Sequence, residues 1–403
     1  MRREDGAVRK VLVAASVASM IDQFNMPDIR LLLDMGYEVH VACNFREGNT
    51  CSRQRVDACR KALERMGVSW HAWDCPRSLK SAVRCYRACL QLVQLIERYS
   101  FAWIHCHSPI GGALARIAAH DKGVRIIYTA HGFHFYKGAP VKNWLLYYPA
   151  EKLLARWTDV IVTVNREDYR FAKRHLHAGK TVHIPGVGIA DTYASGADGE
   201  KERFCRKYHI PANARILLSV GELNKGKNHR LVIRALAKMQ RQDLYYLICG
   251  QGCLEKELQQ YADSLGVGKR IRMPGFQDDM PFVYRNADIF VFPSMREGMP
   301  VALMEAMAAG LPCVVSDIRG NRELVDAAFN GQKQIFRQVL YSRSAGIRFS
   351  LKHPRQLTVA LELLLRNEKL CRRCGRNGLE KIRAYRIDIV QEKMREIYEY
   401  MGE

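Results

Sequence analysis

Several features that mark common classes of protein are missing from this chain of 403 residues. It has no run of about eighteen apolar residues, which excludes a membrane-spanning helix. No G-x-G-x-x-G follows its first predicted strand, which disfavours a nicotinamide dinucleotide cofactor. No two aspartates stand two positions apart, so an Asp-x-Asp metal site is absent. No internal repeat is evident, which disfavours a solenoid or a propeller.

Acidic residues are also scarce. The chain has 41 Asp and Glu against 63 Lys and Arg, a formal net charge of +22 that is spread over both halves. A basic protein binds polyanions, which include nucleic acid, anionic lipid headgroups and phosphorylated small molecules. A nucleic-acid-binding protein is further expected to carry clustered basic and aromatic readout motifs, and none is present. Charge alone does not choose between the other two.

The thirteen cysteines are scattered and odd in number. Cys371 and Cys374 form a lone C-x-x-C, and zinc needs more ligands than that. In His105-Cys106-His107, only the two histidines share a face of a strand, which is again too few for a metal. We expect reduced thiols, no secretory leader and a cytoplasmic location.

Short apolar runs alternate with helical patterns along the chain, which predicts an α/β protein of doubly wound parallel sheets. The best boundary is Pro185–Gly188 followed by the small-residue segment Ile189–Gly199. We predict domains at 1–188 and 189–380, and a C-terminal helix in 381–403. The predicted strands are Val11–Ala15, Tyr37–Cys43, Trp103–His107, Arg125–Thr129, Asp159–Asn165, Val182–Ile184, Arg215–Val220, Leu244–Cys249, Ile271–Pro274, Ala287–Phe292 and Leu311–Ser316. The predicted helices include Pro27–Met35, Leu79–Glu97, Val301–Ala309, Pro354–Leu365 and Leu379–Tyr400.

The segment 287–317 has the most informative pattern, a strand, a turn with Glu297 and Gly298, a helix, and a second strand. The free N–H groups of the helix's first turn, at Val301 and Ala302, are suited to binding a phosphate. The carboxylates of Glu297 and Glu305 are suited to accepting hydrogen bonds from sugar and ribose hydroxyls. The alternative is that both are solvated charges near a helix start.

The order E-G-x-P-x4-E-A-x2-A-G-x-P, from Glu297 to Pro312, resembles the E-x7-E signature of family 4 retaining glycosyltransferases. The resemblance extends over most of residues 10–326. It implies the GT-B fold, two Rossmann-like domains that face each other across a cleft. The first domain would bind the acceptor and the second the nucleotide sugar, and the last helix would cross back to the first. Glu297 would hold the donor sugar and Glu305 the ribose.

Other donor-binding residues follow from the second half of the chain. Lys225 and Lys227 lie in a glycine-containing loop between a strand and a helix, which is a phosphate-binding geometry. The family usually has an Arg and a Lys here. Lys227 matches the Lys, but Glu222 stands where the Arg is common, so either Lys225 supplies the second charge or one cation fewer holds the donor. Phe276, after a later strand, is the candidate for the nucleotide base.

In the first half, His131 follows the strand Arg125–Thr129 and is followed by a glycine. The resemblance places a histidine at this step beside the donor sugar. Asp22 and Asn25 belong to a predicted loop, Ser16–Asn25, at the carboxyl edge of the first strand, where ligands bind. They could face the acceptor, although polar residues in such loops are often structural.

Residues 139–157 mix aromatic and aliphatic side chains with Lys and Arg. This segment is either a membrane-interface helix or a core helix whose basic ends reach the solvent. The stretch from Thr129 to Pro140 resembles bacterial enzymes that build capsule, exopolysaccharide or O-antigen repeats of lipopolysaccharide on a polyprenyl-diphosphate carrier. That resemblance implies a lipid-linked acceptor and peripheral contact with the inner face of the cell membrane.

The combined expectation is a retaining hexosyltransferase that moves a sugar from a nucleotide-diphosphate donor, a UDP-sugar, to a lipid-linked saccharide. We expect no cofactor, no required metal and no nucleic acid. His131, Glu297 and Lys227 would be catalytic. A UDP-sugar epimerase on the same fold is the alternative, and a basic nucleic-acid-binding protein is a second. Asn330–Arg348 departs from the family pattern and is interpreted as an insertion.

Overall fold

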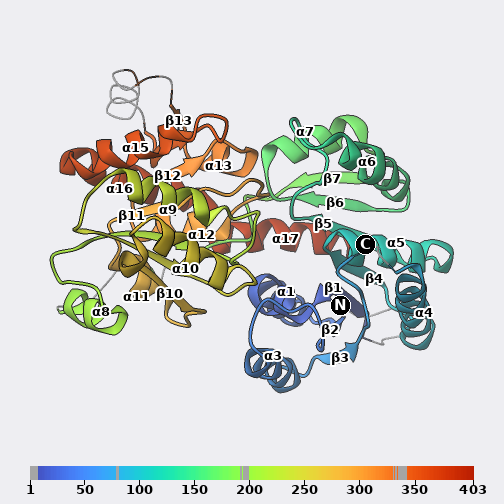
Figure 1. The fold of residues 1–403 in the computed structure, drawn as a ribbon. Coiled ribbons are helices and arrows are strands. Elements are labelled where there is room, and N and C mark those ends of the chain that lie inside the picture. The colour runs from blue at the N-terminus through green and yellow to red at the C-terminus, as the bar shows by residue number, and fades with distance from the viewer. Residues whose placement is uncertain are drawn as a thin grey trace. The chain divides into compact units, whose positions relative to one another are not determined.

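The computed structural model of the protein describes residues 8–78, 81–190, 193, 199–329, 331, 334 and 343–403. The chain divides into two compact units, Met1–Val187 with Asp388–Glu403, and Gly188–Ile387. Each unit contains one seven-stranded sheet, and all the paired strands run parallel. Parallel neighbours need crossover connections, which the helices of Figure 1 supply. The predicted α/β fold of two doubly wound sheets is confirmed, whereas the roles predicted for the two domains stay predictions.

The sheet of the first unit has the order β3-β2-β1-β4-β5-β6-β7. Its strands are β1 (Lys10–Val17), β2 (Glu38–Asn44), β3 (Ser69–Ala72), β4 (Trp103–His107), β5 (Arg125–Ala130), β6 (Val160–Thr163) and β7 (Lys180–His183). The connections run in opposite directions on either side of the β1/β4 pair. This pair is therefore the topological switch point of the unit, where open α/β sheets bind ligands.

The helices of the first unit fill the crossovers between these strands. They are α1 (Ala18–Met20), α2 (Met26–Asp34), α3 (Arg53–Arg65), α4 (Ala82–Tyr99), α5 (Pro109–Ala119), α6 (Val141–Ala155) and α7 (Arg166–His175). A further helix, α17 (Ile387–Gly402), comes from the C-terminal end of the chain and connects no two of these strands. The loop predicted over Ser16–Asn25 is wrong, because α1 begins at Ala18 and a π-helical turn, Ile21–Asn25, joins it to α2. Pro27 cannot donate a backbone hydrogen bond, and the widened turn before it lets the helix continue past that position.

The last helix, α17, packs against the sheet of the first unit. The ring of Tyr398 stacks on that of Trp103 at 5.2 Å, and its hydroxyl lies 3.0 Å from His105 Nδ1. Arg125 donates to the carbonyl of Met401, and Figure 1 marks this end of the chain beside β4 and β5. The single helix predicted over Leu379–Tyr400 is wrong. The structure has α16 (Glu368–Ile382), a 3-10 turn and then α17.

The sheet of the second unit has the order β10-β9-β8-β11-β12-β14-β13, with its switch point at β8/β11. Its strands are β8 (Arg215–Val220), β9 (Leu244–Cys249), β10 (Ile271–Gly275), β11 (Ile289–Phe292), β12 (Cys313–Ser316), β13 (Ala327–Ala328) and β14 (Gly346–Phe349). Its helices include α8 (Glu200–Tyr208), α9 (His229–Lys238), α10 (Glu255–Ser264), α11 (Met280–Arg285), α12 (Val301–Ala308), α13 (Arg319–Leu324), α15 (Arg355–Leu365) and α16.

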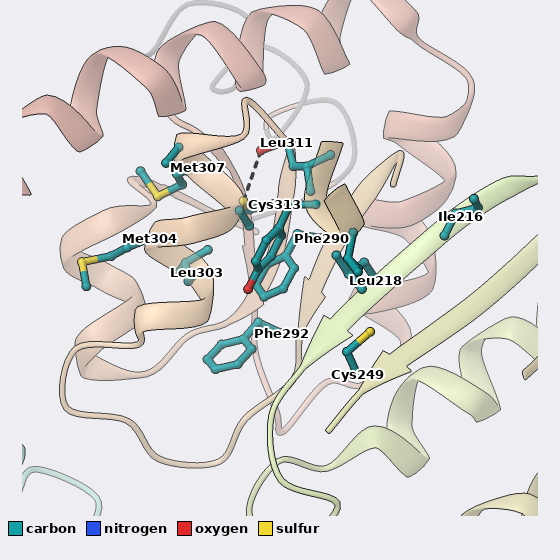
Figure 2. Packing of buried hydrophobic residues seen from close by; sticks show 14 of the residues in the cluster. Ile216, Leu218, Cys249, Phe290, Phe292, Leu303, Met304, Met307, Leu311 and Cys313 are labelled. Carbon is teal, nitrogen blue, oxygen red and sulfur yellow. Dashed lines mark hydrogen bonds between the residues drawn. The ribbon is translucent and has the colours of Figure 1, made fainter. Parts of the chain in front are cut away.

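Apolar packing fixes α12 on the sheet. Figure 2 shows Leu303 of α12 facing Phe290 and Phe292 of β11, with Leu218 of β8 beside them. All four side chains are at most 2% exposed. Burying a side chain of this size stabilises by about 1.5–3 kcal/mol, so the position of the α12 N-terminus is set by the core beneath it.

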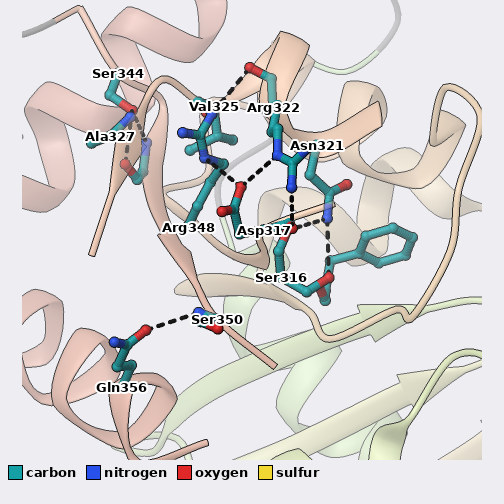
Figure 3. Close-up of polar contacts among 12 residues, drawn as sticks. Ser316, Asp317, Asn321, Arg322, Val325, Ala327, Ser344, Arg348, Ser350 and Gln356 are labelled. Carbon is teal, nitrogen blue, oxygen red and sulfur yellow. Dashed lines mark hydrogen bonds and ion pairs between the residues drawn. The ribbon is translucent and has the colours of Figure 1, made fainter. Parts of the chain in front are cut away.

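The insertion predicted at Asn330–Arg348 is partly wrong. Most of it lies outside the described residues, but Gly346–Arg348 begin β14, a regular strand between β12 and β13. Figure 3 shows Arg348 of this strand beside Asp317, which also pairs with Arg322 of α13 at 2.9 Å. The strand was missed because its apolar run is short and interrupted by an arginine.

Candidate active site

Two loops meet at the switch point of the second unit. Residues 221–228 follow β8, and residues 293–300 follow the neighbouring strand β11. The backbone N–H of Met295 donates to the Gly226 carbonyl at 2.8 Å, and the Asn228 amide donates to the Pro293 carbonyl at 3.3 Å. These bonds hold the two loops as one structural feature at the edge where ligands bind.

The first loop is shaped to position Lys227. Its backbone N–H donates to Asn224 Oδ1 at 3.0 Å. Gly221 has a φ of 149°, and a Cβ there would lie 3.0 Å from Lys227 Cε, so the lysine side chain runs closely over the glycine. Asn228 ends the loop at a φ of 57°, a left-handed conformation that asparagine tolerates better than most residues.

Lys227 and Glu297 are brought into direct contact. Lys227 Nζ donates to Glu297 Oε1 at 2.7 Å, and the two side chains are 24% and 17% exposed. The Glu297 carbonyl accepts from Arg319 Nε at 3.0 Å, which fixes the backbone under the carboxylate. Lys225, by contrast, is exposed. The pair is accessible enough to meet a ligand and has little freedom to move.

The turn from Gly298 to α12 is closely packed. A Cβ at Gly320 of α13 would lie 2.4 Å from the Gly298 carbonyl, so α13 packs directly on this turn. Val301 and Ala302 form the first turn of α12, and their N–H groups have no acceptor within the helix. The N-terminus of α12 therefore offers backbone donors and a partial positive charge beside Lys227.

Glu305, on α12, is held by two tyrosines. Tyr193 donates its hydroxyl to Oε1 and Tyr284 donates to Oε2, each at 2.8 Å. Burial raises the pKa of Glu305, and the two hydroxyl groups oppose that shift. Each carboxylate oxygen has two lone pairs, so this arrangement orients Glu305 and leaves acceptor capacity on both oxygens for a ligand's hydroxyls.

Phe276 follows β10 and is half-buried, and its carbonyl accepts from the Gln277 side chain at 2.9 Å. β10 is at one end of the sheet, separated from β8 by β9. Its predicted contact with a nucleotide base stays a prediction.

In the first unit, the half-buried His131 follows β5 and contacts the buried His107, which ends β4 at the switch point. His131 Nε2 lies 3.2 Å from His107 Nδ1, and His107 Nε2 lies 3.0 Å from the Asn25 amide nitrogen. The ring of Phe24 lies beside that of His131. Burial lowers the pKa of His131 to about 4, so its imidazole is neutral at pH 7. The histidine can exchange hydrogen bonds with a ligand but carries no charge.

The two residues predicted for the acceptor side have other partners. Asn25 is 1% exposed and its amide nitrogen lies 3.0 Å from His107 Nε2, and its predicted acceptor contact stays a prediction. The π-helical turn, where a loop was predicted, ends at Asn25 and buries it. Asp22 Oδ2 accepts from Arg55 Nε at 2.6 Å and is 18% exposed, and its acceptor contact stays a prediction.

Two family models match the chain: "Glycosyl transferase 4-like domain" over residues 28–186 and "Glycosyl transferases group 1" over residues 200–381. A putative glycosyltransferase, EpsD, from Bacillus subtilis (strain 168) is 33% identical over 397 residues, 97% of this chain and 96% of that protein. The chain belongs to the group 1 glycosyltransferases. The predicted family is thereby confirmed.

This glycosyltransferase is similar to further proteins over parts or all of its length. It is 30% identical over 261 residues to UDP-Gal:alpha-D-GlcNAc-diphosphoundecaprenol alpha-1,3-galactosyltransferase of Escherichia coli, covering 62% of this chain and 67% of that one. The solved structure of Anabaena HepE in complex with UDP and glucose superposes with a TM-score of 0.76 at 16% identity, covering 97% and 100% of the two chains. That likeness supports the GT-B fold.

Three residues of the candidate site could not be recognised from the sequence pattern. Tyr193, Tyr284 and Arg319 reach Glu305 and the Glu297 backbone from distant positions in the chain. Tyr193 had one usable signal, since it is the lone aromatic residue in the small-residue segment Ile189–Gly199. Among the residues that the structure describes, no group of three His, Cys, Asp or Glu side chains could hold a metal ion.

Proposed function

We propose that this glycosyltransferase moves a sugar from a UDP-sugar to a lipid-linked saccharide, with retention of anomeric configuration, in the synthesis of a surface polysaccharide. The carrying observation is the Lys227–Glu297 contact of 2.7 Å beside the amide end of α12. It combines a cation, backbone donors and a carboxylate, which a sugar diphosphate requires. The names of the similar E. coli enzyme and of the HepE complex supply the donor and acceptor classes.

In the proposed reaction, the bond between the sugar's anomeric carbon and the β-phosphate oxygen breaks. The acceptor hydroxyl attacks the same face, and its proton passes to the departing phosphate. Negative charge therefore grows on that phosphate in the transition state. Lys227 and the N–H groups of Val301 and Ala302 would stabilise it through preorganised electrostatics. No protein side chain is needed as the base.

The remaining residues would bind and orient the donor. Glu305, fixed by Tyr193 and Tyr284, would accept hydrogen bonds from the ribose hydroxyls, and Glu297 would accept them from the transferred sugar. His131 would contact the sugar as a neutral hydrogen-bonding group, since its pKa of about 4 excludes a cation at pH 7. Phe276 would lie at the base, and Lys225 would add charge near the diphosphate.

The proposed function predicts acceptor-dependent release of UDP. The purified chain should release UDP from one member of a panel of UDP-sugars only when a polyprenyl-diphosphate-linked saccharide is added. Because no metal is required, EDTA should not change this release. The product's anomeric configuration, read by NMR, should match that of the donor. Consumption of UDP-sugar without acceptor would instead favour the epimerase. A salt-dependent shift of DNA without UDP affinity would favour nucleic-acid binding.

We also propose peripheral membrane contact through α6. Among the described residues, eight of the twelve exposed large apolar side chains lie on α4, α5 and α6, which follow one another on one side of the sheet (Figure 1). Val141 and Leu145 of α6 are 73% and 74% exposed, and Lys142 and Lys152 are exposed with them. Exposed aliphatic and basic side chains on one helix fit an anionic lipid surface.

The aromatic residues of α6 do not belong to that surface. Trp144 and Tyr148 pack with Phe135 inside the unit. Glu151 forms a buried bidentate pair with Arg116 of α5, at 2.5 and 3.1 Å, which fixes the helix's rotation. The inward aromatic residues fit the core-helix interpretation, and the exposed aliphatic and basic residues are the basis of the proposed membrane contact. The described part of the chain contains no helix with the length and hydropathy of a membrane span.

Replacing Leu145 and Leu146 together by serine should lower binding to vesicles of phosphatidylglycerol and phosphatidylcholine roughly tenfold or more, because buried leucines contribute about 1.5–3 kcal/mol each. Co-sedimentation measures the bound fraction, and salt should weaken it further. Leu265→Ser, at an exposed leucine of the second unit, is the matched control. Equal vesicle binding by the double variant and the control would remove α6 from the proposal.

A further inference from the structure

A cavity of about 400 Å³ in the first unit is lined only by polar side chains: three arginines, two carboxylates and two amides. It lies where β2 and β3 end, since Asn44 is the last residue of β2 and Asp74 follows β3 closely. Carboxyl ends of parallel strands are where α/β sheets bind ligands. None of the residues proposed to contact the donor, the acceptor or the membrane lines this cavity.

The floor of this pocket is rigid. Asn44 is 4% exposed, and its Oδ1 accepts the backbone N–H groups of Arg46 and Glu47, both at 2.9 Å. Its amide donates to the Cys75 carbonyl at 3.4 Å, which ties the loop after β2 to the segment after β3. The nearby Trp73 ring nitrogen donates to the Ala88 carbonyl at 2.8 Å and anchors α4 to the same segment.

The wall of the pocket is a face of α4. Arg84, Arg87 and Gln91 are spaced three and four residues apart, so they lie on the same side of the helix. Gln91 Nε2 donates to Asp74 Oδ2 at 2.8 Å, and Gln91 Oε1 accepts the Asp74 N–H at 2.9 Å. These two bonds join the wall to the floor without using either arginine.

The charges in the pocket do not cancel. Glu47 pairs with Arg84 at 2.5 Å, whereas Asp74 keeps its negative charge because its partner Gln91 is neutral, so the three arginines and two carboxylates leave a net charge of +1. Arg46 and Arg87 have no carboxylate partner within the part of the chain that the structure describes. A guanidinium group presents a planar fork of N–H donors that matches phosphate oxygens. Two exposed guanidinium groups without a carboxylate partner, beside the fixed Asn44, are suited to the several acceptor oxygens of one phosphate group.

We propose that this pocket binds a phosphate or diphosphate group through Arg46 and Arg87. Resting on the proposed function, we assign that group to the lipid-linked acceptor. β1 and β4 separate β2 from β5, so the pocket is three strand spacings, about 14 Å, along the sheet from the strand that precedes His131. The diphosphate and the reacting hydroxyl of one acceptor can therefore occupy different places on the same sheet edge.

The test is calorimetric titration of the full chain with inorganic pyrophosphate, with UDP at saturation to fill the donor site. The unmodified protein should bind pyrophosphate, and Arg46→Gln/Arg87→Gln should raise the Kd at least tenfold. Arg65→Gln/Arg98→Gln is the matched control, since it removes the same charge from exposed ends of α3 and α4 and should change the Kd less than twofold. Thermal unfolding should be alike for the two double variants.

Three outcomes would overturn the assignment. The unmodified protein could fail to bind pyrophosphate in the presence of UDP, or both double variants could weaken binding equally, which would indicate diffuse charge rather than a pocket. Glucuronate binding as tightly as pyrophosphate would replace the phosphate by a carboxylate. UDP affinity is measured separately on every variant. Loss of UDP binding with pyrophosphate binding retained would count against the proposed function and leave the pocket standing.

Discussion

Lys227→Ala should lower kcat by about 10²- to 10³-fold, which corresponds to roughly 2.7–4 kcal/mol of lost transition-state stabilisation. The lysine ammonium contacts Glu297 at 2.7 Å, and its side chain crosses Gly221 closely enough to have little freedom. In the proposed mechanism the charge on the β-phosphate is larger in the transition state than in the bound donor. The loss should therefore be greater in kcat than in donor KM. Steady-state release of UDP measures both constants.

Two comparisons make the Lys227 result specific. Lys238→Ala removes an exposed lysine at the other end of α9 and should leave turnover within twofold. Lys225→Ala tests whether the second lysine of the loop replaces the family's arginine. Because Lys225 is exposed, we expect a smaller loss than for Lys227. A Lys227→Ala enzyme with normal kcat, or a larger loss from Lys225→Ala, would contradict the assignment of the leaving-group cation to Lys227.

Much of the fold could be predicted because its strands are short apolar runs with clear ends. Trp103–His107, Arg215–Val220 and Leu244–Cys249 are strands over the predicted residues, and each is followed by a serine or a glycine. β3 lacked such a signal, since its four residues are only partly buried. Local pattern predicts an element when the residues that decide it are neighbours in the chain.

In the candidate site, likewise, residues that are close in the sequence could be predicted, and contacts between distant residues could not. Glu297, Gly298 and the start of α12 lie in one motif, and Lys227 lies in one loop, so the resemblance to family 4 glycosyltransferases could select them, whereas spacing alone left the solvated-charge alternative open. The pairing of Lys227 with Glu297 spans 70 residues and depends on β8 and β11 being neighbours in the sheet. Tyr193 lies 112 residues from Glu305, so no local pattern could select its contact. The burial of Asn25 could not be predicted, because the π-helical turn that causes it has no local sequence signature.

Glu297→Gln should lower kcat/KM about 10- to 100-fold and leave UDP affinity unchanged. The amide preserves the shape of the side chain and can still accept from Lys227, but it loses the charge that strengthens hydrogen bonds to sugar hydroxyls, worth about 1.5–3 kcal/mol. UDP lacks the transferred sugar, so its affinity should not respond, whereas the affinity for the intact UDP-sugar should fall. Calorimetry with UDP and with the UDP-sugar separates the two. Glu255→Gln, at an exposed glutamate of α10, is the matched control.

The pattern of loss in Glu297→Gln decides what this carboxylate does. If UDP and UDP-sugar affinities fell by the same factor, Glu297 would be acting through Lys227 on the diphosphate rather than on the sugar. If Glu297→Gln and the control Glu255→Gln both turned over as fast as the unmodified enzyme, Glu297 would be only a structural partner of Lys227 and Arg319. The contact with Lys227 makes both alternatives physically reasonable, because each residue of the pair limits where the other can reach. Only a loss confined to ligands that carry the sugar supports direct binding of the sugar by Glu297.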